Sequence, residues 1–251
     1  FPQVRRIENY DNRGFAAANN RAFRVMTGRY ALLLNSDMVL TEGAVRDLFA
    51  FMEEHPEAVM ACGQLLNADG SKQNPIVRFP AILSLLLGMS LLETFFPDRY
   101  PSKHRGCHHP IEVESCIGAC LMVRKSAIGG VGGFDECYDH YCAAVDWAVT
   151  MRKAGGKIYH VPSTRIYHRQ RRSVGTDVRS RMHFFGPGIS LHVWESPARS
   201  LLAAILIVLR LVAKWVLTVA GVMLTLGLNR RLRDTWAVNT KLLAWHLRGC
   251  P

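Results

Sequence analysis

The stretch that decides the fold is Tyr30-Ala31-Leu32-Leu33-Leu34-Asn35-Ser36-Asp37, where an apolar run ends in three polar residues. A short apolar run of this length predicts a buried strand. Asp37 then lies at the carboxyl end of the strand, which is where ligands bind in open α/β sheets. A carboxylate there can hold a divalent cation, and the cation can hold a diphosphate. The same three residue types also favour solvated turns, so the tripeptide alone leaves both interpretations open.

The segments up to about residue 170 alternate between strand and helix patterns. Further strands are expected at Val59–Leu65, Val113–Val123 and Ile158–Val161, the last stopped by Pro162. Helices are expected at 41–55, capped by Thr41, and at 143–154, closed by Gly155-Gly156. This alternation predicts an α/β domain with a mostly parallel sheet.

Composition and charge narrow the class of protein. The chain has 251 residues, 49% hydrophobic and 20% charged, which is enough for one sizeable core and an appendage. Its formal net charge of +11 suits an anionic partner: nucleic acid, an acidic membrane surface or a phosphorylated substrate. Much of this charge is local, because residues 165–181 hold six arginines and a single aspartate. A solvated basic loop explains that stretch equally well.

The seven cysteines do not form a disulfide pattern. Their number is odd and no C-x-x-C pair occurs, which favours a reducing compartment. Cys107-His108-His109 with Cys116 and Cys120 matches no usual zinc-ligand spacing, so a zinc site is not expected.

A second region begins near residue 181. Ser200–Leu228 is apolar apart from Arg210 and Lys214, and it is long enough to cross a bilayer. The two cations recur on one helical face, which favours an interfacial helix over a true span, and a span over a buried soluble helix. Arginines follow directly, and Trp236–Leu247 is a further candidate amphipathic helix.

Several short motifs occur in a fixed order along the first 170 residues. They are Asn12-x-Gly14-Phe15-Ala16-x-x-Asn19, Leu34-Asn35-Ser36-Asp37, Asp69-Gly70 with Gln73, Gly118-Ala119-Cys120, Gly132-Gly133-Phe134-Asp135-Glu136, Val145-Asp146-Trp147, and Val161-Pro162 with His168. The ordered set resembles the family-2 inverting glycosyltransferases, particularly the bacterial rhamnosyltransferase-like branch. The resemblance implies a GT-A (Rossmann-like) glycosyltransferase domain over residues 1–180, followed by a membrane-associating helical region over 181–251.

The resemblance also implies roles for individual residues. Asp37 and His168 would bind Mn²⁺ or Mg²⁺. The donor-binding candidates are Asn12, Gly14, Asn19, Asn35 and Asp37. The candidates for the acceptor or sugar pocket are Gly118, Ala119 and Trp147.

Two departures from the family pattern predict an impaired enzyme. Phe1-Pro2-Gln3-Val4 resembles the stretch that follows the family's first strand–helix–strand, which binds the nucleotide base and ribose, so a truncated chain is expected. Ala143 and Ala144 stand where the family carries a Glu-Asp pair that includes the candidate general base. Asp146 remains as the catalytic candidate, with alternatives at Asp135, Glu136 and Asp139.

The sequence therefore predicts a glycosyltransferase on the cytoplasmic face of the bacterial inner membrane. It would move a sugar with inversion from a nucleotide-sugar donor, with dTDP-rhamnose as one candidate, to a polysaccharide or lipid-linked acceptor. The alternative is a catalytically inactive, membrane-associated sugar-binding or scaffold protein. A nucleic-acid-binding protein is not expected, because no nucleic-acid motif is recognisable.

Overall fold

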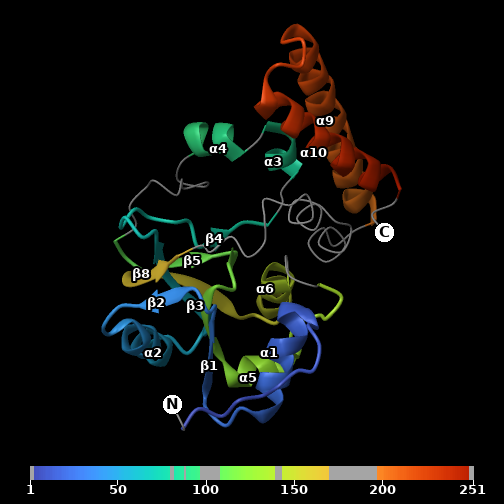
Figure 1. Cartoon of the computed structure of the whole chain (residues 1–251). Helices are drawn as coiled ribbons and strands as arrows, with labels where there is room; N and C mark the ends of the chain where they lie inside the picture. The colour runs from blue at the N-terminus through green and yellow to red at the C-terminus, as the bar shows by residue number, and fades with distance from the viewer. Residues whose placement is uncertain are drawn as a thin grey trace. The chain divides into compact units, whose positions relative to one another are not determined.

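The computed structural model describes residues 3–79, 82–87, 89–96, 108–138, 143–169 and 197–248 (Figure 1). The chain forms two compact units. The first joins Phe1–Phe79 to Ser102–Arg171, and the second joins Pro80–Pro101 to Arg172–Pro251.

A mixed sheet forms the centre of the first unit. Its strands, in spatial order, are β1 (Tyr30–Leu34), β7 (Cys120–Arg124), β3 (Ala58–Leu66), β8 (Lys157–His168) and β2 (Met38–Leu40), and β5 (Ile111–Val113) also pairs with β8. Only β3 and β8 are parallel; the other pairings in this sheet are antiparallel. The expected α/β class is confirmed, but the expected mostly parallel sheet is wrong. The difference arises because β7 lies between β1 and β3 and runs antiparallel to both, and because β2 and β5 pair antiparallel with β8; β7 follows β6 (Ser115–Cys116), which belongs to a separate two-stranded sheet.

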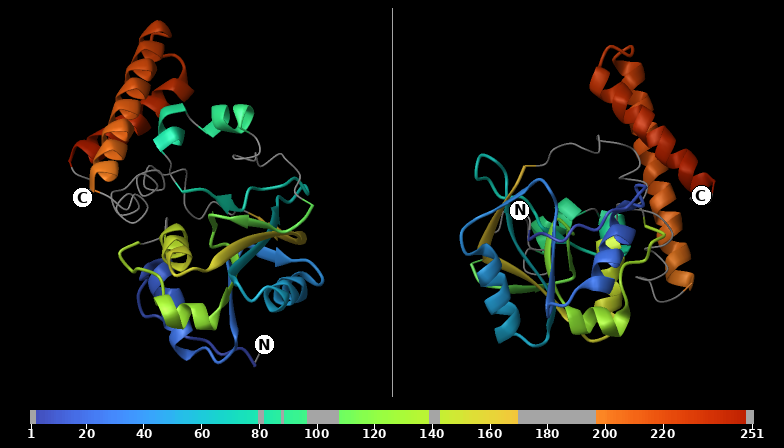
Figure 2. Two further views of the ribbon diagram at one scale, coloured as in Figure 1. Left: turned by 180° about the vertical axis from the view of Figure 1, so that it is seen from behind. Right: turned by 60° about the horizontal axis from the view of Figure 1, so that its bottom comes forward.

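Helices cover both faces of this sheet. In Figures 1 and 2, α2 (Ala44–Glu54) lies on one face, and α1 (Gly14–Val25), α5 (Lys125–Val131) and α6 (Ala143–Lys153) lie on the other. The α2 face is built on Leu48, Phe51 and Met52, which pack against apolar side chains of β3, β7 and β8. The order of strands and covering helices places the carboxyl end of β1 beside the start of β7.

The helix α2 begins later than its sequence indicates. Its N-cap is Gly43, whose φ of +80° favours glycine, and not Thr41. The Thr41 hydroxyl instead donates a hydrogen bond to the Arg165 carbonyl at 2.5 Å. Thr41 therefore fastens the segment after β2 to β8, and the expected cap is wrong.

Two strand predictions also need correction. The expected strand Val113–Val123 is divided into β5, β6 and β7, and β6 leaves the main sheet to pair with β4 (Ile76–Val77). Pro162 does not stop β8, which continues to His168. The pairing with β3 skips from Val161 to Arg165, so the missing N–H of the proline falls in an irregular part of the ladder.

Aromatic side chains fill the space between α1 and α6. Trp147 of α6 packs against Phe23 and Phe134, with ring centroids 5.5 and 4.2 Å away, and its Nε1 donates to the Gly132 carbonyl at 2.9 Å. Asn20 of α1 exchanges two 2.8 Å hydrogen bonds with the backbone of Phe134. A Cβ at Gly133 would lie 2.2 Å from Asn20 Oδ1, so this close approach requires glycine.

The second unit is helical in its described part. It contains α3 (Ile82–Leu87), α4 (Met89–Phe95), α9 (Pro197–Leu224) and α10 (Arg230–Leu247). The helices α9 and α10 pack through a small core that includes Ala203, Ile207, Leu211 and Leu242. Trp215 of α9 donates to Thr240 of α10 at 2.8 Å.

Candidate active site

The turn after β1 is held by backbone hydrogen bonds on both sides. The Asn35 N–H donates to the Ala119 carbonyl at 2.9 Å, which joins the end of β1 to the start of β7. The Met38 N–H donates to the Asn35 carbonyl at 3.2 Å, which closes the turn that carries Asp37. Strand β2 follows immediately and pairs with β8 in a register that sets Met38 opposite His168.

This register brings Asp37 and His168 together. Asp37 Oδ2 lies 3.5 Å from His168 Nε2, and the two side chains are only 17% and 13% exposed. The Arg169 N–H donates to the Asp37 carbonyl at 3.0 Å, so the backbones are joined as well. The two residues that the sequence nominates as metal ligands are therefore neighbours, although 131 positions separate them in the chain.

Gln73 completes this cluster, although no separate role was predicted for it from the sequence. His168 Nδ1 lies 2.8 Å from Gln73 Oε1, and Gln73 Nε2 donates to the His168 carbonyl at 2.8 Å and to Asn67 Oδ1 at 2.7 Å. Gln64 in turn donates to the Gln73 carbonyl at 2.7 Å. The His168 imidazole is therefore held on its Nδ1 side by the Gln73 side-chain amide, and other hydrogen bonds hold that amide in place.

The Asp37–His168 pair fits a divalent cation. Asp37 Oδ1 is buried and has no hydrogen-bond partner within the described ranges, so one carboxylate oxygen lacks the partner that a buried polar atom requires. Carboxylate oxygen suits Mg²⁺ and Mn²⁺, and imidazole also binds first-row metals. No group of three or more His, Cys, Asp or Glu residues suited to a metal occurs in the described part of the chain. The remaining ligands of a cation would be water or substrate oxygens.

A second group of candidate residues lies between α1, β7 and α6. A Cβ at Gly118 would meet the Phe15 ring at 3.0 Å and the Ala144 methyl at 3.5 Å. The next residue, Ala119, carries the carbonyl that accepts from Asn35. Gly118 and Ala119 thus connect the end of β1 to the first turn of α6, and a side chain at 118 would crowd this junction.

The donor-binding candidates in α1 use their side chains locally. Asn12 Oδ1 accepts a 3.1 Å hydrogen bond from the N–H of Gly14, whose φ is +81°. Asn19 Nδ2 donates to the Phe15 carbonyl at 2.8 Å. These hydrogen bonds lie within the start of α1 and do not reach Asp37. Asn12 is exposed and Asn19 is half-buried.

Helix α6 carries the two alanines and Asp146. Ala143 is 1% exposed, whereas Ala144 is half-buried beside the Gly118 position. Asp146 is buried, and the Tyr138 hydroxyl lies 3.5 Å from its Oδ1. Trp147 is a core residue at 2% exposure, which leaves little of its ring to line a sugar pocket. Of the alternative carboxylates, Asp135 and Glu136 are exposed, and Asp139 lies outside the described residues.

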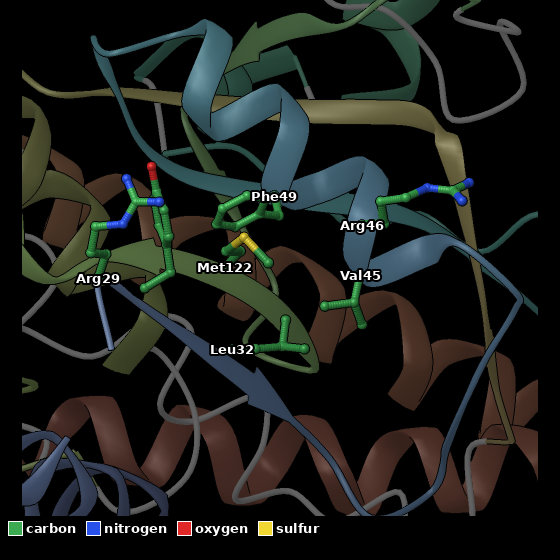
Figure 3. A pocket seen from close by; sticks show the side chains of 7 residues that line it. Arg29, Leu32, Val45, Arg46, Phe49 and Met122 are labelled. Carbon is green, nitrogen blue, oxygen red and sulfur yellow. The ribbon is translucent and has the colours of Figure 1, made fainter. Parts of the chain in front are cut away.

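An open pocket of about 620 Å³ lies elsewhere on the first unit, against the α2 face of the sheet. Figure 3 shows Leu32, Val45, Phe49 and Met122 around it, with Arg29 and Arg46 at its two ends. Arg29 pairs with Glu53 at 2.9 Å. None of the residues expected at the site lines this pocket, and the sequence did not predict it.

Buried titratable groups lie in the core away from the Asp37 cluster. Burial, with a smaller contribution from the charge of Lys72, lowers the pKa of His160 to about 4. Burial also raises the pKa of Cys120 to about 12 and that of Cys62 well above its usual value. Among the described residues the free cysteines are Cys62, Cys116, Cys120 and Cys137. The basic residues 171–181 and Cys107 lie outside the described part.

Solved structures identify the fold class. The chain is similar to the mannosyltransferase PcManGT from Pyrobaculum calidifontis in complex with GDP-Man and Mn²⁺, with a TM-score of 0.50, 13% identity, and coverage of 97% of this chain and 68% of that one. It is also similar to GalNAc-T7 with UDP, GalNAc and Mn²⁺, with a TM-score of 0.50, 11% identity, and coverage of 73% and 36%. The first unit thus has the GT-A fold.

The amino-acid sequence also identifies the protein family. A family model described as Glycosyl transferase family 2 matches residues 1–132, more than half of the chain. The protein belongs to glycosyl transferase family 2, as its motifs predicted.

Two curated relatives refine the comparison. N-acetylglucosaminyl-diphospho-decaprenol L-rhamnosyltransferase of Mycobacterium tuberculosis is 28% identical over 198 residues, with coverage of 72% of this chain and 64% of that protein. Rhamnosyltransferase WbbL of Escherichia coli K12 is 26% identical over 167 residues, with coverage of 62% and 60%. The chain therefore spans about three fifths of the length of these relatives.

Proposed function

We propose that the protein is a rhamnosyltransferase-like enzyme that transfers a sugar from a nucleotide-sugar donor, with inversion, to a lipid-linked or polysaccharide acceptor. The observation that carries this proposal is the Asp37–His168 pair at the carboxyl end of β1: Asp37 Oδ2 faces His168 Nε2, and Asp37 Oδ1 is buried without a partner among the described residues. The names of the relatives support rhamnose as the sugar and a prenyl diphosphate as the acceptor anchor. The donor candidate is dTDP-rhamnose.

In this proposal Asp37 and His168 hold Mn²⁺ or Mg²⁺. Once bound, the ion supplies positive charge to the diphosphate leaving group. The residues of the chain do the positioning: Asn35 fixes the turn through Ala119, and the start of α1 with Asn12, Gly14 and Asn19 forms the donor side. Gly118 and Ala119 form the floor of the sugar pocket beside Ala144.

The acceptor base is the weak point of this site. An inverting transfer needs a group that takes the proton of the acceptor hydroxyl. Alanine cannot do so, and Asp146 is buried against Tyr138. Ala144 is the position from which a longer side chain would extend beside Gly118, since its methyl would lie 3.5 Å from a Cβ at residue 118. A catalytically inactive, membrane-associated sugar-binding or scaffold protein is therefore the second candidate function.

We assign residues 1–180 to the catalytic domain and 181–251 to membrane association on the cytoplasmic face of the inner membrane. The support is α9, within which Leu201–Leu224 has a mean hydropathy of 2.2 and only 17% of its most apolar window buried. By length and composition it is the one helix in the described residues that is able to cross a membrane. A lipid-linked acceptor would be presented at that surface.

A donor panel tests the proposal. The protein is incubated with Mn²⁺, a prenyl-diphosphate-linked acceptor, and dTDP-rhamnose, UDP-GlcNAc or GDP-mannose, and transfer of labelled sugar to the lipid fraction is measured. Transfer from dTDP-rhamnose alone supports the rhamnosyltransferase. Binding of that donor without transfer supports the inactive alternative, and transfer from another donor overturns the rhamnose assignment.

A further inference from the structure

The hydrogen bonds of Gln73 decide which of its side-chain atoms faces His168. A backbone carbonyl can only accept a hydrogen bond, and the His168 carbonyl lies 2.8 Å from one end of the Gln73 amide. That end must be the NH₂ group, Nε2. The Leu66 carbonyl, 3.4 Å away, lies toward the same end. The other end, Oε1, therefore faces His168 Nδ1 at 2.8 Å.

This orientation fixes the position of the imidazole proton. An amide oxygen only accepts, so Nδ1 must carry the hydrogen in that contact. In the neutral ring the lone pair is then on Nε2, the nitrogen that faces Asp37 Oδ2 at 3.5 Å. Two acceptor atoms thus face each other across a gap, and the second carboxylate oxygen is buried without a partner in the described structure. A cation is the kind of occupant that satisfies all three atoms.

The amide of Gln73 is not free to turn over. Its Nε2 also donates to Asn67 Oδ1 at 2.7 Å, and Asn67 Nδ2 donates to the Ser71 hydroxyl at 2.7 Å. The backbone of Gln73 is held as well. Its N–H donates to the Leu65 carbonyl, and its carbonyl accepts from the Gln64 side chain. A reversed amide would set Oε1 against the His168 carbonyl and lose the donations to that carbonyl and to Asn67 Oδ1, so one orientation is strongly favoured.

We infer that Gln73 is a positioning residue that holds His168 in the Nδ1–H tautomer and so directs the Nε2 lone pair toward Asp37. This inference rests on the proposed metal-dependent transfer, because a fixed Nε2 lone pair matters for a cation site. Outer hydrogen bonds of this kind orient imidazole ligands, and their loss weakens metal binding by ~10–100-fold.

The test compares Gln73→Leu with Gln73→Glu. Both replacements lose the donations to Asn67 and to the His168 carbonyl, but only glutamate keeps an oxygen opposite Nδ1. The tautomer is read from imidazole ¹⁵N shifts of the metal-free, histidine-labelled protein at a pH where the ring is neutral, with His168→Gln used to assign the signal. Mn²⁺ affinity is measured in parallel by electron paramagnetic resonance of the free ion, with Asp37→Ala as the reference and circular dichroism as the check of folding.

We expect the wild type and Gln73→Glu to show the Nδ1–H tautomer and similar Mn²⁺ affinity. Gln73→Leu should lose the tautomer preference and bind Mn²⁺ ~10–100-fold more weakly. A wild-type proton on Nε2 overturns the inference without any variant. If both replacements weaken Mn²⁺ binding equally and leave the tautomer unchanged, Gln73 only supports the local fold, and the inference is also overturned. If Asp37→Ala binds Mn²⁺ as well as the wild type does, the proposed metal site fails, and this inference fails with it. If Asp37→Ala weakens Mn²⁺ binding and Gln73→Leu does not, the proposed metal site stands and only this inference fails.

Discussion

At the scale of single residues, the cluster at the end of β1 is built from side chains that are satisfied on one side and open on the other. Gln73 is bonded on every side, His168 is bonded through Nδ1, and Asp37 has an oxygen with no partner in the described structure. Hydrogen bonding thus increases away from the point where Asp37 and His168 meet. Such an arrangement is typical of a ligand site prepared by its surroundings.

Asp37 should be essential for binding of a divalent cation. Asp37→Ala removes both carboxylate oxygens, and we expect Mn²⁺ affinity to fall at least ~100-fold, because changes outside the ligand shell alone cost ~10–100-fold. Calorimetric titration with Mn²⁺ and a nucleoside diphosphate measures this. Asp11→Ala, at an exposed carboxylate, is the matched control. Comparable losses in the two variants would contradict the assignment.

His160 should make stability depend on pH. Its side chain is 3% exposed, both ring nitrogens lack hydrogen-bond partners in the described residues, and its pKa is lowered to about 4. The unfolded chain binds a proton near the ordinary pKa of 6.5, whereas the folded protein does not until about 4. Stability is therefore lost as the pH falls through this window, by on the order of 3 kcal/mol in total.

Urea unfolding at several pH values between 7 and 4 measures the effect. We expect His160→Leu to have a flatter pH dependence than the wild type, because the replacement does not titrate. His109→Leu serves as the control, since His109 is exposed. A parallel pH dependence in the wild type and His160→Leu would show that other groups cause the change.

At the scale of elements, the apolar runs were predictable and the pairings were not. The strand Tyr30–Leu34 has the bounds expected from its sequence, because an apolar run followed by polar residues indicates where a strand ends, although only Leu33 of the run is buried. The direction of β7 depends on how the chain returns between β1 and β3, which no local pattern states. The Asp37–His168 pair followed from a resemblance, whereas the role of Gln73 depends on a contact across 95 positions that periodicity cannot reveal.

Helix α9 should attach the protein to a membrane through its exposed apolar face. Leu209 and Leu217 are 59% and 72% exposed. The double replacement Leu209→Glu/Leu217→Glu removes two exposed leucines that would insert into lipid, a loss on the order of 4 kcal/mol of apolar transfer free energy, and adds two charges. We expect the variant to move from the membrane to the soluble fraction after sedimentation.

The control for the α9 double replacement adds two glutamates outside α9. Ala18→Glu/Ala50→Glu alters exposed positions on α1 and α2 and should leave the protein with the membrane. Release of the wild type by carbonate indicates an interfacial helix, and release only by detergent indicates a span. A wild-type protein found in the soluble fraction would contradict both.

At the scale of the whole molecule, the two alanines at the start of α6 bear on the rate of the proposed sugar transfer. We expect the unmodified protein to transfer sugar slowly and Ala144→Asp to raise the rate by ~10²–10⁴-fold, the usual contribution of a general base. Ala143→Glu should instead destabilise the protein, because a carboxylate at a 1% exposed position would be buried.

Release of nucleoside diphosphate in the presence of acceptor measures the rate. Ala144→Asn is the matched control, since it has the size of aspartate but cannot take a proton. Equal rates for the Asp and Asn variants would exclude a base at this position. Fast turnover by the unmodified protein would show that another group, such as Asp146, already serves.

The position of β1 at the edge of the sheet has a consequence for handling the protein. In the described structure β1 pairs with β7 alone, so its other side presents backbone N–H and C=O groups, and its sequence YALLL contains neither charge nor proline. Such an edge is a template for adding a strand from another molecule, and natural proteins usually protect it. We therefore expect concentrated solutions to self-associate, which light scattering would detect. The replacement Leu34→Lys, at a side chain that is already 42% exposed, should reduce this self-association.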